Sequence, residues 1–287
     1  MVIDVHAHTS DSRLHGLHTD QADLDYLRMQ AEKFGIEKIY LMATYFPLKK
    51  SGLSNSVLLK RIDGNPIFGC FGSLDMENKF VEGLVELTDL AANKLISGIK
   101  IYPGYQEIFL SDPKFDPLFQ LAEEYQLPVA CHLGELHHCC SRELKDGENY
   151  RCGSTHCLLD HRGYLSHPRQ FGMMVKRFPK VNFIACHLGN PYFRELRKVM
   201  SECDNVYTDF SGQFLSGTNE DSPDYRLKLK AEIDKFLLLK NGPDRLLFGT
   251  DFPIQSYEDT FQLLELLNIN AEEKEKITRI NAEKLNL

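Results

Sequence analysis

The chain has 287 residues, 43% of them hydrophobic and 26% charged, and its 33 basic and 41 acidic residues give a formal net charge of −8. This composition is ordinary for a globular protein and excludes a collagen, a coiled coil and a largely disordered chain. The negative charge argues against a general nucleic-acid-binding protein, because neutralising phosphates requires a basic surface.

The composition and the N-terminus also bear on membranes and on export. No apolar run reaches the roughly 18–20 residues that cross a membrane. The N-terminal sequence MVIDVHAHTSDSR lacks the basic and apolar regions of a signal peptide. We therefore expect a cytoplasmic protein with a small-molecule substrate and with neither a nucleic-acid nor a membrane partner. A homodimer is compatible with these features.

Short apolar runs alternate with amphipathic segments along the chain. The runs are rich in β-branched and aromatic residues, as buried parallel strands are, and they cover residues 2–7, 38–45, 66–74, 96–102, 128–133, 181–188, 206–210 and 245–252. Helical patterns occupy residues 20–34, 79–93, 117–125, 168–178, 191–202, 224–240 and 257–267.

This alternation predicts an α/β fold with a parallel sheet. Eight apolar runs alternating with amphipathic segments indicate a (β/α)8 TIM barrel that forms a single domain over residues 1–287, with its active site at the carboxyl ends of the strands. An open doubly wound sheet is the alternative. That fold is less favoured because the chain has no glycine-rich phosphate loop of the type GxGxxG or GxxxxGK[ST].

Strongly polar side chains stand at the ends of five apolar runs. His6 lies in the first run and His8 directly follows it, two residues apart, so both are expected to project from the same face of a strand. The other runs end with Lys100 and Tyr102, His132, His187 and Asp251. Burying such groups is costly unless they are paired or bind a metal. The joint pattern therefore favours a metal site over a set of unrelated core residues.

Five motifs in order along the chain, HAH, GIKIYP, CHLGE, HLGNP and GTDFP, are similar to those of the amidohydrolase superfamily. The stretch HPRQFGMMVKRFPKVNFIACHLG resembles its amidohydrolase-related branch, which includes aminocarboxymuconate semialdehyde decarboxylase, related aromatic-acid decarboxylases and hydrolases of lactones such as 2-pyrone-4,6-dicarboxylate. The resemblance covers nearly the whole chain. It implies a divalent metal, usually zinc, at the mouth of the barrel, and it does not identify the substrate.

The resemblance also implies roles for individual residues. The implied metal ligands are His6, His8, His132 and Asp251. Asp251 would also accept a proton from the metal-activated water, and His187 would act as a second catalytic group near the developing oxyanion. In a binuclear site His187 would instead bind a second metal and Lys100 would be a carboxylated bridge. One or two zinc ions per chain therefore remain open.

A long connection over residues 134–167 interrupts the alternation after the fifth run. Because barrel sites are built from the loops that follow the strands, we predict that this connection is a lid over the active site. His137 and His138, together with Tyr102, are the expected substrate-binding residues. The lid also contains a group of cysteines, which forms either a structural zinc site or a set of free thiols: Cys139, Cys140, Cys152 and Cys157.

These features favour a metal-dependent hydrolase that uses a metal-activated water to cleave an ester, lactone or amide bond in a small molecule. The alternative is a metal-dependent, non-oxidative decarboxylase of a small carboxylic acid, for which a clamp formed by arginines such as Arg13, Arg151, Arg162 or Arg169 would be expected. A catalytically silent binding barrel is the least favoured reading, because an inactive relative is expected to have lost ligands.

The lid cysteines provide the first test. Their spacing is not that of a regular CxxC…CxxC site, so the sequence favours free thiols. The Cys152→Ser, Cys157→Ser double variant should therefore keep the zinc content of the unchanged protein, as measured by elemental analysis of the purified chain. Loss of about one zinc ion per chain would instead establish a structural zinc site in the lid.

Overall fold

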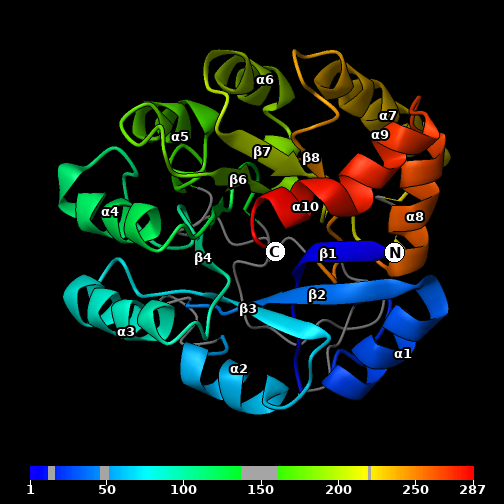
Figure 1. Ribbon diagram of the computed structural model, residues 1–287. Coiled ribbons are helices and arrows are strands. Elements are labelled where there is room, and N and C mark those ends of the chain that lie inside the picture. Colours follow the sequence, from blue (N-terminus) through cyan, green and yellow to red (C-terminus); the bar gives the residue numbers. More distant parts are fainter. Residues whose placement is uncertain (12–16, 46–51, 137–160, 219–220) are drawn as a thin grey trace. The chain divides into compact units, whose positions relative to one another are not determined.

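The structure of the protein, a computed structural model, describes residues 1–11, 17–45, 52–136, 161–218 and 221–287 (Figure 1). Its strands form one eight-stranded sheet in the order of the sequence. They are β1 (Val2–Ala7), β2 (Ile36–Met42), β3 (Phe68–Gly72), β4 (Gly98–Ile101), β5 (Val129–Cys131), β6 (Phe183–Ala185), β7 (Val206–Asp209) and β8 (Leu246–Leu247). The fold is a (β/α)8 TIM barrel, as the sequence predicts.

Helices separate the strands along the chain. The main ones are α1 (Leu24–Phe34), α2 (Asn55–Ile62), α3 (Phe80–Ala92), α4 (Asp116–Glu124), α5 (Pro168–Val175), α6 (Phe193–Glu202), α7 (Pro223–Leu237) and α8 (Tyr257–Leu266). Among the described residues, none of these helices has the length and apolar character needed to cross a membrane.

Two helical regions are absent from the sequence prediction. One is α2, which has only two turns, too few to establish a helical period. The other is the C-terminal segment of α9 (Ala271–Glu275), a π-helical turn (Lys276–Ile280) and α10 (Asn281–Lys284), whose pieces are shorter still. A readable signal did exist there, because Asn270 and Glu273 form a capping box at the start of α9.

The chain divides into two compact units, of which the first comprises residues 1–41, 64–69 and 207–287. Within it β1 pairs with β2 in parallel, with Val2 opposite Ile36, and β7 pairs with β8. The backbone N–H of Val5 donates to the carbonyl of Phe248, at 3.1 Å, just after β8. The first strand therefore lies beside the end of the last, a neighbour relation that a closed barrel requires and an open doubly wound sheet lacks.

Helices α7 and α8 are neighbours in this unit (Figure 1). Asp259, near the start of α8, connects this helix with the loop after β7. Its carboxylate accepts hydrogen bonds from the hydroxyl of Ser216 in that loop and from the hydroxyl of Ser256, both at 2.6 Å. Arg226 of α7 forms an ion pair with the same carboxylate. Burial alone would raise the pKa of Asp259, but these hydrogen bonds and the ion pair hold it below its ordinary value of 3.8.

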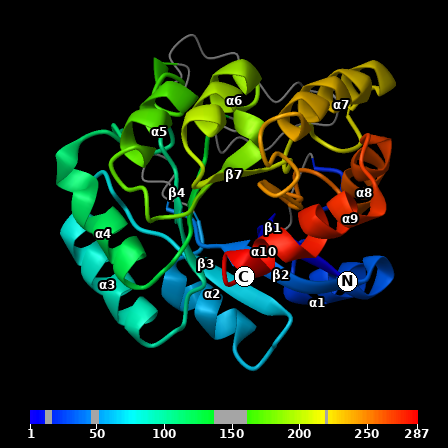
Figure 2. The ribbon, with the colours of Figure 1, turned by 45° about the horizontal axis from the view of Figure 1, so that its top comes forward.

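The second unit comprises residues 42–63 and 70–206. Its central strands are parallel, with Ile99 of β4 opposite Val129 of β5, and Val129 opposite Phe183 of β6. Helix α3 packs beside α4, and α5 beside α6 (Figure 2). The strands β5 and β6 contain only three residues each. His132 and His187 therefore lie in the connections that follow these strands, not within them.

Asp259 allows a test of stability against pH. A carboxylate with a lowered folded-state pKa contributes stability above its unfolded-state pKa, and that contribution is lost as the pH falls toward the folded-state value. Asp259→Asn should therefore lower the free energy of unfolding at pH 7 by about 1–3 kcal/mol and should weaken its dependence on pH between about pH 5 and pH 2. Urea denaturation at a series of pH values measures both effects. An unchanged pH dependence in the variant would contradict this role of Asp259.

Candidate metal centre

In the first unit, two histidines and an aspartate converge at the end of β1. His8 Nε2 lies 3.2 Å from Asp251 Oδ1, and His6 Nε2 lies 3.5 Å from the same oxygen. His6 is 1% exposed, whereas the side chain of His8 is 24% exposed and that of Asp251 is 15% exposed. The group is therefore buried on the side of His6 and accessible on the side of His8. The sequence predicts that these three residues belong to one site, and the structure brings them together.

Backbone hydrogen bonds position Asp251 against β1. Its N–H donates to the carbonyl of His6 at 2.7 Å, and the N–H of His8 donates to the carbonyl of Phe252 at 2.8 Å. Asp251 has a φ of 55°, in the left-handed region that residues other than glycine rarely adopt. This conformation turns its carboxylate toward the two imidazoles at the point where the chain leaves the barrel.

Asp4, a buried carboxylate on β1, stabilises the contact between β1 and the segment after β8. It accepts hydrogen bonds from the N–H of His6 at 3.0 Å and from the N–H and hydroxyl of Thr250 at 3.1 and 2.7 Å. Burial raises the pKa of Asp4 to about 7, although the hydrogen bonds oppose this shift. The sequence analysis gives Asp4 no role. The available signal is its position two residues before His6 in an otherwise apolar strand.

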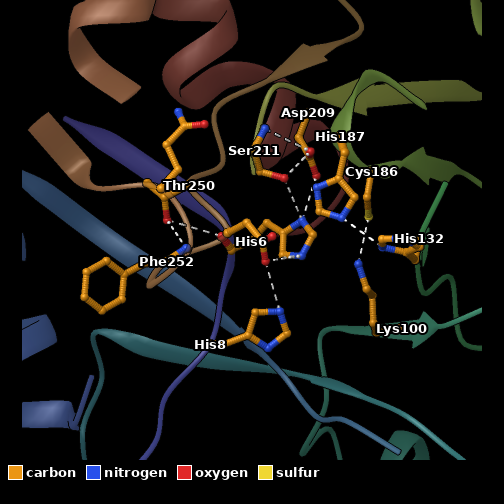
Figure 3. A network of polar contacts seen from close by, with 12 residues as sticks. His6, His8, Lys100, His132, Cys186, His187, Asp209, Ser211, Thr250 and Phe252 are labelled. Carbon is orange, nitrogen blue, oxygen red and sulfur yellow. Dashed lines mark hydrogen bonds and ion pairs between the residues drawn. The ribbon is translucent and has the colours of Figure 1, made fainter. Parts of the chain in front are cut away.

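Asp209 and Ser211 make contacts on the other side of the His6 ring (Figure 3). Asp209 Oδ2 lies 3.1 Å from His6 Nδ1, and Ser211 Oγ lies 3.0 Å from the same nitrogen. Sequence reasoning missed both residues. Asp209 ends an apolar run just as His132 and Asp251 do, so its place at a strand end was a usable signal.

The group of His6, His8 and Asp251 fits a divalent metal. One ligand atom from each residue lies within 4.8 Å of the other two. Two imidazole nitrogens and a carboxylate oxygen are ligands typical of zinc and related divalent ions. In such sites a ligating histidine commonly donates a hydrogen bond from its other ring nitrogen to a carboxylate, which is the position of Asp209 beside His6.

A second polar group lies in the second unit. His187 Nε2 is 3.1 Å from His132 Nδ1, and His132 Nε2 is 3.1 Å from the carbonyl oxygen of Glu135. His187 has a φ of 63° and is followed by Leu188 at 54° and Gly189 at 62°. A single residue separates this left-handed run from the end of β6, and the run places His187 against His132. The roles of these two histidines as a ligand and a catalytic group stay predictions.

Lys100 and Tyr102, from β4 and the residues after it, have partners within the second unit. The fully buried Lys100 donates from Nζ to Cys186 Sγ at 3.0 Å (Figure 3). The Tyr102 hydroxyl donates to the carbonyl of Ala43 at 2.8 Å, and the residue is only 3% exposed. Tyr105, which is less buried, contacts His132 edge-on with ring centroids 4.9 Å apart. The substrate-binding role of Tyr102 stays a prediction, and Tyr105 is a contact that the sequence analysis does not consider.

The predicted lid residues lie outside the described residues. They are His137, His138, Cys139, Cys140, Cys152 and Cys157. The predictions of a lid, of a zinc or thiol cluster and of substrate contacts by the two histidines therefore stay predictions. The described cysteines Cys70, Cys131, Cys186 and Cys203 are buried, and they form no disulfide bond among the described residues.

Comparison with known proteins agrees with the sequence resemblance. A family model described as "Amidohydrolase" matches residues 3–285. Solved structures also match the chain over nearly its whole length. A TIM-barrel protein from Bordetella bronchiseptica is 17% identical, with 99% of this chain and 98% of that chain covered and a TM-score of 0.72.

Two further similar structures carry names that indicate a reaction. A probable 2-pyrone-4,6-dicarboxylic acid hydrolase from Acinetobacter baumannii, with citric acid bound, is 15% identical, with 99% and 98% of the two chains covered and a TM-score of 0.68. A dihydroxybenzoic acid decarboxylase from Polaromonas sp. JS666, with bound manganese and an inhibitor, is 17% identical, with 99% and 96% covered and a TM-score of 0.66. At these identities the likeness concerns the fold.

Gly212 allows a test of the close packing around Asp251. Gly212 has a φ of +56°, and a Cβ atom there would lie 2.5 Å from Asp251 Oδ2. Gly212→Ala should displace the Asp251 carboxylate and weaken the binding of Mn²⁺ or Zn²⁺ by about tenfold or more, in line with other losses of ligand support. A competition titration with a metal-binding dye measures the affinity.

Gly217→Ala is the matched control. Gly217 also has a positive φ, +76°, but a Cβ atom there would make only an ordinary contact, at 3.5 Å, with the Cβ of His18. Both variants carry a similar backbone strain of about 1–2 kcal/mol, so only Gly212→Ala should affect metal binding. Equal affinities in the two variants would show that Asp251 does not depend on the space left by Gly212.

Proposed function

Because the chain belongs to the amidohydrolase family, we propose that it is a metal-dependent hydrolase that cleaves an ester, lactone or amide bond of a small molecule with a metal-activated water. The observation that carries this proposal is the convergence of His6, His8 and Asp251, with one ligand atom of each within 4.8 Å of the others. Similar solved structures of named function include both hydrolases and decarboxylases, so the choice of reaction belongs to the proposal.

We assign the metal to His6, His8 and Asp251, with zinc as the proposed ion and His132 as the predicted third nitrogen ligand. When bound, such an ion lowers the pKa of a water molecule to about 7 and polarises a carbonyl oxygen. Lys100 bears on the number of ions. It donates to the buried Cys186 thiol, and carboxylation of Lys100 would place a negative charge beside that sulfur. This contact supports one ion per chain over a bridged pair.

We assign separate steps of the proposed hydrolysis to Asp251 and His187. Asp251 is partly exposed and lies within 3.5 Å of both imidazoles, so we assign it the acceptance of a proton from the attacking water and its return to the leaving group. His187 is proposed to stabilise the negative charge that develops on the carbonyl oxygen.

Non-oxidative decarboxylation is the second candidate, because one of the similar structures is a dihydroxybenzoic acid decarboxylase with bound manganese. An arginine clamp for the substrate carboxylate would favour it. Arg162, one of the arginines named for that role, pairs instead with Glu107 at 2.7 Å and with Glu77 at 3.7 Å. These acidic partners offset its charge, which makes Arg162 less suited to that clamp; Arg13 and Arg151 lie outside the described residues.

A turnover assay on the metal-loaded protein tests the proposal, with a panel of lactones, esters and amides and a second panel of hydroxylated aromatic acids. Hydrolysis of a member of the first panel is expected. Asp251→Asn should lower kcat for that substrate by about 10²–10⁴-fold, the usual contribution of an acid-base group, while its circular dichroism and thermal unfolding stay those of a folded barrel. Asp244→Asn, which alters a carboxylate that pairs with Lys276 and Lys284, is the control and should keep full turnover.

Each outcome of this assay has a distinct meaning. Release of carbon dioxide from an aromatic acid without hydrolysis of the first panel would replace the hydrolase with the decarboxylase. Failure of the protein to bind any divalent ion would contradict both enzymatic functions. Turnover by Asp251→Asn at the rate of the unchanged protein would remove the catalytic role of Asp251 and leave the metal site to be judged by affinity alone.

A further inference from the structure

His6 lies between two carboxylates, and the contacts on its Nδ1 side bear on how it binds a metal. Asp209 Oδ2 is 3.1 Å and Ser211 Oγ is 3.0 Å from Nδ1 (Figure 3). On the other side of the ring, Nε2 is 3.5 Å from Asp251 Oδ1. His6 is 1% exposed, and Asp209 and Ser211 are fully buried. Water cannot readily replace these contacts, so the protons must be shared among the residues themselves.

The hydroxyl proton of Ser211 has a nearer acceptor than His6. Ser211 Oγ lies 2.6 Å from Asp209 Oδ1, and the Ser211 N–H donates to the same oxygen at 3.2 Å. A hydroxyl has one proton to donate. Once that proton is on Asp209, the Ser211 oxygen can only accept at His6. Both groups that face Nδ1 are then acceptors, and the hydrogen of a neutral His6 lies on Nδ1.

The reverse arrangement is unfavourable. If Ser211 donated to an unprotonated Nδ1, the lone pair of that nitrogen would face the carboxylate oxygen of Asp209 at 3.1 Å in a buried site. Two acceptors at such a distance repel one another, and in a buried site this repulsion costs free energy that water cannot offset. The proton on Nδ1 avoids this cost and leaves the lone pair of Nε2 directed at Asp251.

We propose that Asp209, supported by Ser211, is a positioning residue that holds His6 as the Nδ1–H tautomer and thereby directs its Nε2 lone pair to the metal. The inference rests on the proposed metal site and adds a specific support to it. His6 Nε2 and Asp251 Oδ1 are both acceptors in this arrangement and lie 3.5 Å apart. A divalent cation bound to both atoms would replace their repulsion with two favourable contacts. The competing arrangement is an imidazolium at His6, with one proton directed to each carboxylate.

The backbone around the three residues leaves room for this close arrangement. A Cβ atom on Gly249 would lie 3.1 Å from the Cβ of His6, 3.3 Å from that of Ser211 and 3.4 Å from that of Asp209. Gly249 precedes the Thr250–Asp251 segment, and Asp209 is the last residue of β7. The absence of a side chain at Gly249 therefore allows the end of β7, the end of β1 and the chain after β8 to meet around His6.

Metal affinity tests the proposal without an activity assay. Asp209→Asn should weaken the binding of Zn²⁺ by about 10–100-fold, the range found for such supporting carboxylates, in a competition titration with a chelating dye. Ser211→Ala should weaken binding by a smaller factor, because Ser211 acts through Asp209, and Ser211→Thr, which keeps the hydroxyl, should restore it. Asp244→Asn again serves as the control carboxylate and should bind Zn²⁺ as the unchanged protein does.

The tautomer can be observed directly. In the metal-free protein labelled with ¹⁵N-histidine, the His6 signals, assigned by their loss in His6→Gln, should have the shifts of an Nδ1–H imidazole at pH 7.5. In Ser211→Ala and Asp209→Asn the population of the Nε2–H form should rise. This measurement keeps the test valid if Asp209→Asn fails to fold, because Ser211→Ala removes only a hydroxyl.

Two results would overturn the inference. One is an unchanged Zn²⁺ affinity in folded Asp209→Asn, and the other is an imidazolium at His6 in the unchanged metal-free protein at pH 7.5. Failure of the proposed function would look different. In that case the metal would bind, and binding would depend on Asp209, but no substrate of either panel would be turned over.

Discussion

The hydrogen bonds between β1 and the segment after β8 are the constraint on which the candidate site depends. The N–H of Asp251 donates to the carbonyl of His6, and the N–H of His8 donates to the carbonyl of Phe252. A closed barrel makes the first and last strands neighbours, so residues at opposite ends of the sequence share one set of backbone bonds. His6 of β1, His8 directly after β1 and the aspartate after β8 meet for this reason. Asp4 stabilises this contact of β1 with the segment after β8 through its hydrogen bonds from Thr250.

The cost of burying polar groups explains the composition of this cluster. A buried imidazole and buried carboxylates are tolerated only if their donors and acceptors are matched or a cation completes the set. In the first unit the contacts run from Ser211 to Asp209, then to His6 and on to Asp251. On the Asp251 side, the Nε2 lone pair of a neutral His6 with its proton on Nδ1 would face a carboxylate oxygen at 3.5 Å. A divalent metal between these two acceptors would bind both of them.

The second unit contributes a different kind of site. His132 and His187 contact one another through ring nitrogens, and Lys100 contacts Cys186. The first unit gathers the carboxylates of Asp209 and Asp251 around His6, whereas the imidazole and amino groups of the second unit can donate hydrogen bonds. Such groups suit the stabilisation of negative charge on a substrate. The identity of the substrate depends on the loops that follow the strands, as it does in barrel enzymes generally.

The eight strands, most of the helices and the candidate metal ligands could be predicted from the sequence. Strands and helices follow from short-range periodicity, and a histidine pair spaced two apart on a strand shares a face whatever surrounds it. The short helix α2 and the C-terminal helical segment were not predicted, because their helical pieces are too short to show a repeating pattern of apolar residues. Three features became visible only in the folded chain: the pairing of Asp209 and Ser211 with His6, the left-handed conformation of Asp251, and the contact between Lys100 and Cys186. These contacts join residues from 86 to 205 positions apart, or depend on a backbone conformation stabilised by such partners. No local pattern in the sequence encodes them, because they exist only once the strands have assembled.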